Sequence, residues 1–92
     1  MSDYPDSDDI RKIKRWKIKT YSECHRLMDF VFSIWSYPDR CWRLPDGQYR
    51  LSTGGWSGNE SIIEAMKGNY LFWTLFWQSS NRGGGHTFGE SL

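Results

Sequence analysis

The chain has 92 residues, a length that supports one small domain with a single core and leaves no room for a second core. Twelve Lys or Arg residues nearly balance eleven Asp or Glu residues, so the net charge of +1 creates no overall field to attract nucleic acid or an anionic membrane. The longest apolar run, "YLFWTLFW", is far shorter than the roughly 20 residues of a membrane-spanning helix. We therefore expect one soluble domain, residues 1–92, with no membrane partner and with nucleic acid a disfavoured one.

The cysteine and histidine content argues against a metal or a disulfide framework. Cys24 and Cys41 are too few for such a framework and lack metal-ligand spacing. With no signal peptide ahead of them, we expect free thiols in a reducing cytoplasm. Two histidines are too few for a convincing metal site, and we expect no cofactor.

The N-terminal segment predicts a short amphipathic helix. Residues 1–5 are expected to be frayed, and Asp6 or Ser7 caps a helix that runs to about Lys17, with acidic residues at its start and lysines toward its end, as the helix dipole favours. "RKIKRWKIK" is best interpreted as the solvated face of this helix. A DNA-binding regulator acting through this run stays open, but the chain shows no recognisable helix-turn-helix.

The core helix follows. "TYSE" has the capping-box form, which places a helix start at Thr20, and Pro38 ends the helix. An apolar stripe with helical spacing comprises Cys24, Leu27, Met28, Val31, Ile34 and Trp35. Since Cys24 belongs to this stripe, burial is favoured over a catalytic Cys24–His25 pair.

The second half of the chain predicts two hairpins around a helix. "WRLPDGQYRLS" has the alternation and turn residues of a hairpin, and Ser57 with Glu60 forms a second capping box for a helix that ends near Gly68. "NYLFWTLFWQSS" fits a buried strand or a buried helix, and its aromatic content favours a strand over residues 70–78. A closing strand is expected at 86–88. The prediction is an α+β domain: two helices, a hairpin, a helix and a hairpin, in an antiparallel sheet packed by helices.

Two glycine-rich loops, "STGGWSG" and "SSNRGGGH", carry the candidate site. The first precedes a helix whose amides and dipole favour an anion, although it is no Walker loop and, taken alone, is better explained as a strained turn. The second adds a guanidinium and an imidazole, which bind phosphate or polar ligand edges. If the loops share one end of the sheet, they form a nucleotide site of Thr53, Gly54, Gly55, Trp56, Ser57, Arg82 and His86. The alternative is an ordinary hairpin loop beside a packed tryptophan.

Catalysis has less support than binding. Hydrolysis requires an acid and base pair, a metal cluster or an activated nucleophile. Glu60 and His86 are the only plausible pair, and Glu60 is expected to cap a helix. We therefore predict a binding protein without catalytic residues, not an enzyme.

The motifs "DYPD", "SIWSYPD", "YRLSTGGWSGNESIIEAM" and "NYLFWTLFWQSSNRGGGHTF" resemble a family of small uncharacterised proteins of tailed bacteriophages and prophages. The resemblance covers nearly the whole chain. The chain departs from the family pattern at two places. Members carry a "DWGW"-like stretch where this chain has "DRCW", and this chain has one extra glycine before His86 in "SNRGGGH". The resemblance implies a phage accessory protein in the cytoplasm of an infected bacterium and supplies no established activity.

Two functional hypotheses follow. The first is a counter-defence protein that sequesters a small phosphorylated or nucleotide-derived signal through the glycine-rich loops without turnover. The second is a protein that binds and inhibits a host defence enzyme or nuclease effector, using exposed aromatic residues and the charged N-terminal segment. The aromatic content also predicts a homo-oligomer, since pairing would cover an apolar face.

Overall fold

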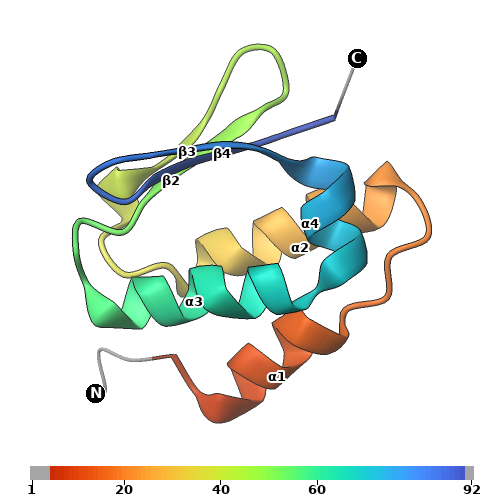
Figure 1. The fold of residues 1–92 in the computed structure, drawn as a ribbon, viewed down its shortest axis with the longest axis horizontal. Coiled ribbons are helices and arrows are strands. Elements are labelled where there is room, and N and C mark those ends of the chain that lie inside the picture. Colours follow the sequence, from red (N-terminus) through yellow and green to blue (C-terminus); the bar gives the residue numbers. More distant parts are fainter. Residues whose placement is uncertain (1–4, 91–92) are drawn as a thin grey trace.

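Two antiparallel hairpins form the sheet of this protein (Figure 1). The computed structural model describes residues 5–90, so residues 1–4 of the predicted frayed segment lie outside the described residues. Within that range the helices are α1 (Ser7–Arg15), α2 (Tyr21–Ile34), the short 3-10 helix η1 (Pro38–Arg40), α3 (Ser57–Gly68) and α4 (Tyr70–Phe76). The strands are β1 (Cys41–Arg43), β2 (Tyr49–Ser52), β3 (Trp77–Asn81) and β4 (Gly85–Phe88). The predicted α+β class is confirmed.

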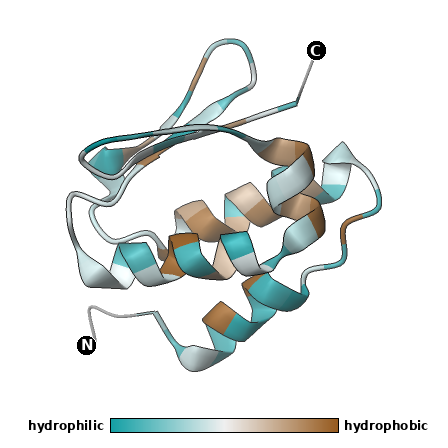
Figure 2. Cartoon of the chain, in the orientation of Figure 1, coloured by the Kyte–Doolittle hydropathy of each residue, from teal (hydrophilic) through white to brown (hydrophobic). Residues whose placement is uncertain are grey.

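The helices lie on one face of the sheet and leave the other face bare (Figure 1). The strand order is β1-β2-β4-β3, with every neighbouring pair antiparallel. Hydrophobic residues concentrate in α2, α3 and α4, whereas the strands are mostly hydrophilic or intermediate (Figure 2). The core between the layers is centred on fully buried side chains that include Leu27, Leu51, Ile62, Phe72, Phe76 and Phe88.

The predicted core helix and first hairpin are confirmed. Thr20 caps α2 with the complete capping box, in which the Glu23 carboxylate accepts from the Thr20 amide at 2.6 Å. Cys24 is fully buried on the helix stripe. The strands of the first hairpin pair with Trp42 opposite Arg50. No helix within residues 5–90 combines the length and the apolar character needed to cross a membrane.

The predicted strand over residues 70–78 is wrong for most of its length, because α4 occupies Tyr70–Phe76 and β3 begins only at Trp77. Asn69 explains the helix: its side chain Oδ1 accepts from the Phe72 amide at 3.3 Å. Phe72 and Phe76, four positions apart, then face the core together. An almost continuous apolar run does not distinguish a helix from a strand, and here the cap and the core decide.

The predicted second capping box is also wrong. Trp56 is the N-cap of α3 and makes no side-chain capping bond, and Ser57 is already the first helical residue. The turn before the helix is closed instead by Thr53, whose carbonyl accepts from the Trp56 amide at 2.9 Å. Glu60 therefore has no capping role.

Candidate functional site

The two glycine-rich loops lie side by side at one end of the sheet. Ser52 pairs with Gly85, and beyond this pair the Thr53 amide donates to the Gly84 carbonyl at 3.0 Å. The contact is close: a Cβ atom on Gly84 would overlap the Thr53 hydroxyl. Thr53 is only 2% exposed. The structure therefore meets the geometric condition on which the sequence-based site depended.

Three backbone amides donate hydrogen bonds within this junction. Besides the Thr53 amide, the Gly55 amide donates to Thr53 Oγ1 at 3.2 Å and the Trp56 amide donates to the Thr53 carbonyl at 2.9 Å. These bonds hold the turn between β2 and α3. The first loop is therefore a folded strand-to-helix turn.

The seven predicted residues fall on two sides of the junction. Ser57 and His86 line a broad groove between α1, α3 and β4, whereas Gly54 and Trp56 line a smaller hollow beside η1. Thr53 lines both. The other two predicted residues, Gly55 and Arg82, line neither, and Arg82 lies in the turn between β3 and β4.

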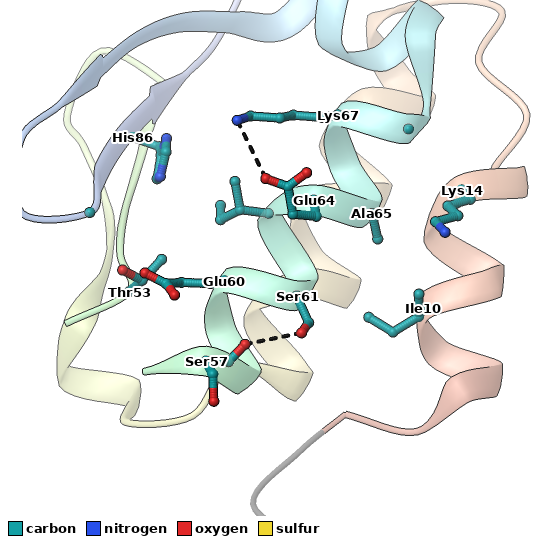
Figure 3. A pocket seen from close by; sticks show the side chains of 13 residues that line it. Ile10, Lys14, Thr53, Ser57, Glu60, Ser61, Glu64, Ala65, Lys67 and His86 are labelled. Carbon is teal, nitrogen blue, oxygen red and sulfur yellow. Dashed lines mark hydrogen bonds and ion pairs between the residues drawn. The ribbon is translucent and has the colours of Figure 1, made fainter. Parts of the chain in front are cut away.

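The groove has a volume of about 830 Å³ and opposing charges along its walls (Figure 3). Lys67 Nζ lies 3.6 Å from Glu64 Oε1, and Lys14 and Glu60 add one further charge of each sign. Because these charges balance, the groove has no net preference for an anion.

His86 faces the groove as part of a polar chain on β3 and β4. Its Nδ1 lies 2.7 Å from Ser80 Oγ, which accepts a hydrogen bond from the Trp77 indole at 2.9 Å. Burial lowers the pKa of His86, and the charge of Lys67 lowers it further. The neutral imidazole is therefore engaged with its own sheet and adds no positive charge to the groove near pH 7.

The smaller hollow, of about 310 Å³, is lined by Tyr37, Asp39, Arg40, Thr53, Gly54 and Trp56. The rings of Tyr37 and Trp56 meet edge to face, with centroids 6.1 Å apart. Gly54 has φ 61°, and a Cβ atom there would lie 3.3 Å from Arg40 Nε, so the absence of a side chain gives the guanidinium room. The hollow thus combines aromatic walls, one guanidinium and one carboxylate.

Sequence reasoning missed Tyr37 and Arg40. The signal was "SYPDR", in which Pro38 does more than end α2: it starts η1, and the Arg40 amide donates back to the Tyr37 carbonyl at 2.8 Å. Tyr37 takes a left-handed conformation with φ 64° and is 53% exposed. A left-handed conformation is uncommon for a bulky residue and occurs in turns and at functional sites.

The arginine of the hollow has no side-chain partner. Within residues 5–90, no ion pair or hydrogen bond is formed by the side chain of Arg40, of Arg50 on β2 or of Arg82 in the adjacent turn. Arg50 lies against Gly85, where a Cβ atom would approach its guanidinium to 2.9 Å. Although Asp39 also lines the hollow, it forms no ion pair with Arg40.

Other polar groups have structural roles. His25 lies 2.6 Å from the Tyr49 hydroxyl through Nδ1 and 2.8 Å from Glu90 through Nε2. Burial raises the pKa of Cys24 to about 11, so its thiol stays protonated near neutral pH. Among the described residues, no group of three or more His, Cys, Asp or Glu side chains is placed to hold a metal ion.

No family model matches the chain, and neither a curated protein nor a solved structure matches it. Its function must therefore be inferred from its own residues.

Proposed function

We propose that the hollow beside η1 binds a small nucleotide-type ligand and that the protein sequesters this ligand without turnover. The observation that carries the proposal is the Arg40 guanidinium, which has no ion-pair partner within residues 5–90. It lies beside Gly54 and lines the same hollow as the Tyr37 and Trp56 rings. Arginine binds phosphate in a bidentate manner, and aromatic rings provide a stacking surface for a base. Asp39 accepts hydrogen bonds from the amino edge of a base or from a sugar hydroxyl.

The size and chemistry of the hollow favour binding over turnover. Its volume of about 310 Å³ lies at the lower end of the range of ligand pockets, about 300–1,000 Å³, and suits one nucleotide unit. Its lining contains one carboxylate and neither histidine nor cysteine. An acid and base pair for hydrolysis would have to come from elsewhere. In the bacteriophage setting implied by the resemblance, such a protein would remove a phosphorylated defence signal from the host cytoplasm.

Thermal unfolding with a panel of nucleotides tests the proposal. The panel contains mononucleotides, cyclic mono-, di- and trinucleotides, and ADP-ribose derivatives. A ligand at about a hundredfold excess over its Kd stabilises the folded state by about 2.7 kcal/mol, which raises Tm by about 10–20 °C in a domain of this size. Arg40→Gln should remove this increase. The matched variant Arg82→Gln should keep it, since Arg82 lies outside the hollow.

Two outcomes would contradict the proposal. One is the absence of a thermal shift across the whole panel. The other is a shift that persists in Arg40→Gln, which would place the ligand outside the hollow. If Arg82→Gln abolished the shift and Arg40→Gln did not, the ligand would bind at the glycine-rich loops predicted from the sequence.

A second candidate function, inhibition of a host defence protein, is supported by an apolar patch on α4 and the start of β3. Tyr70, Leu71, Leu75 and Trp77 are 76%, 54%, 36% and 39% exposed, respectively. Interfaces between proteins are enriched in such aromatic residues and poor in charge. If the patch binds a host protein, Leu71→Asp should abolish capture of that protein from bacterial lysate while Arg40→Gln should not. A second copy of the chain would cover the same patch, and sedimentation of the purified protein tests this predicted self-association.

A further inference from the structure

The bare face of the sheet, here called the outer face, carries one row of side chains that crosses all four strands. Trp42 on β1 is opposite Arg50 on β2, Arg50 is opposite Thr87 on β4, and Thr87 is opposite Ser79 on β3. Neighbouring strand residues such as Leu51 and Phe88 are buried on the helix side. Since side chains alternate along a strand, the row points away from the helices (Figure 1).

The outer face is cationic although the whole chain is nearly neutral. The four strands contain no Asp or Glu residue. At the centre of the row, the Arg50 guanidinium lies over the backbone of Gly85 and has no ion-pair partner within residues 5–90. Arg82 follows β3 at the end of the sheet where Asn81 pairs with Gly85. The distribution of charge, rather than its sum, therefore gives this face a cation at its centre that a phosphate could pair with.

The outer face also provides a stacking surface. Trp42 is 41% exposed, and among the described residues no other ring packs on its indole. Thr87 and Ser79 within the row, and Ser52 and Asn81 beside it, have hydroxyl and amide groups that donate to and accept from base edges. A stacking ring, a backbone-binding cation and adaptable polar groups on a sheet are the features that single-stranded nucleic acid requires.

We infer that the outer face binds a short stretch of single-stranded nucleic acid, with a base stacked on Trp42 and a phosphate paired with Arg50. A duplex is a poorer fit, because its bases are stacked inside and its affinity depends on many phosphate contacts. The face offers one central arginine and one free indole, which suits unpaired bases. The prediction that nucleic acid is a disfavoured partner rests on the net charge, whereas this inference rests on the local arrangement of side chains.

Fluorescence anisotropy with a fluorescein-labelled oligothymidylate tests the inference; its length of about ten nucleotides lies within the range of about 4–16 that one OB fold covers. At low salt the unaltered protein should bind. Trp42→Ala and Arg50→Gln should each weaken binding by about fivefold or more. Arg50→Gln should also reduce the dependence of affinity on salt by about one phosphate contact.

Arg43→Gln is the matched control. It removes the same charge from the neighbouring strand, but Arg43 faces the helix side, where its guanidinium lies over Phe32 and pairs with Asp29. It should leave the affinity nearly unchanged, and thermal unfolding checks that each variant is folded. Absence of binding by the unaltered protein would overturn the inference, as would equal weakening by Arg43→Gln and Arg50→Gln.

The outer face and the hollow are tested separately. Binding of the oligonucleotide without any thermal shift by small nucleotides would support the outer face and contradict the proposed function. A thermal shift that Arg40→Gln abolishes, together with no oligonucleotide binding, would support the proposed function and contradict the inference about the outer face.

Discussion

Two consecutive glycines in the turn between β3 and β4 allow the contact between the glycine-rich loops to be measured. Gly83 and Gly84 have nearly the same backbone conformation, with φ 85° and 84°. Alanine at either position therefore has the same left-handed strain, about 1–2 kcal/mol. The surroundings differ: a Cβ atom on Gly83 meets nothing within 4 Å, whereas one on Gly84 overlaps the Thr53 hydroxyl. The difference between the two variants isolates the contact.

Thr53 has little freedom to move away from such a side chain. It is 2% exposed, its amide donates to the Gly84 carbonyl at 3.0 Å, and its Oγ1 accepts from the Gly55 amide at 3.2 Å. Overpacking at a constrained site costs about 1–3 kcal/mol. Gly84→Ala should therefore lower the free energy of unfolding by about 2–5 kcal/mol, and Gly83→Ala by only about 1–2 kcal/mol.

Thermal and urea unfolding of the two variants measure this difference. Since about 1 kcal/mol corresponds to about 4–8 °C in a domain of this size, Gly84→Ala should melt at least about 4 °C below Gly83→Ala. Adding Thr53→Ala should recover part of the loss in Gly84→Ala and none in Gly83→Ala, as a double-mutant cycle would report. Equal stabilities of the two glycine variants, or no recovery, would refute the close packing of the loops.

Three further predictions concern the core and its ionisable groups. Asn69→Ala should lower the free energy of unfolding by about 3 kcal/mol in urea, because it removes the cap of α4 and two further hydrogen bonds. The Trp16 carbonyl loses the Asn69 donor at 2.9 Å, and the Ile13 carbonyl, which loses it at 3.0 Å, keeps the Trp16 amide as its donor. A loss below about 1 kcal/mol would contradict this role. The pKa of His86 is lower in the folded chain than its ordinary value of 6.5, so the unfolded chain binds the proton more readily. The free energy of unfolding should therefore be at its full value above pH 6.5 and should fall as the pH drops through the folded pKa. Urea titrations should show this dependence, and His86→Gln should flatten it. Ellman's reagent should label Cys41, which is partly exposed, well before the buried Cys24, and labelling of both at one rate in the folded protein would argue against the packing of α2.

The sequence alone was sufficient to predict the structural features that depend on residues a few positions apart. The capping box of Thr20 and Glu23, the apolar stripe through Cys24 and the turn residues of the first hairpin each act within a few positions, and the structure confirms all three. The order of these elements was sufficient to predict the α+β class. The proximity of the two glycine-rich loops stayed conditional on the hairpins sharing one sheet, and only the structure shows that they do.

Contacts between residues far apart in the chain determined the structural features that local patterns predicted wrongly. The run that contains Phe72 is equally apolar as a strand or a helix, and its helix depends on Asn69, whose amide donates to the Ile13 carbonyl 56 positions away. Thr53, whose carbonyl closes the turn before α3, also donates its amide to the Gly84 carbonyl of the other hairpin.

The candidate site has the same dependence on tertiary structure. Gly54 and Trp56 were visible as loop residues, but Arg40 became their partner only when η1 packed beside them. On the sheet, strand pairing placed Trp42 beside Arg50. Local pattern thus determined which elements form, whereas packing between elements far apart in the chain determined which side chains meet, because such contacts have no fixed spacing in the sequence.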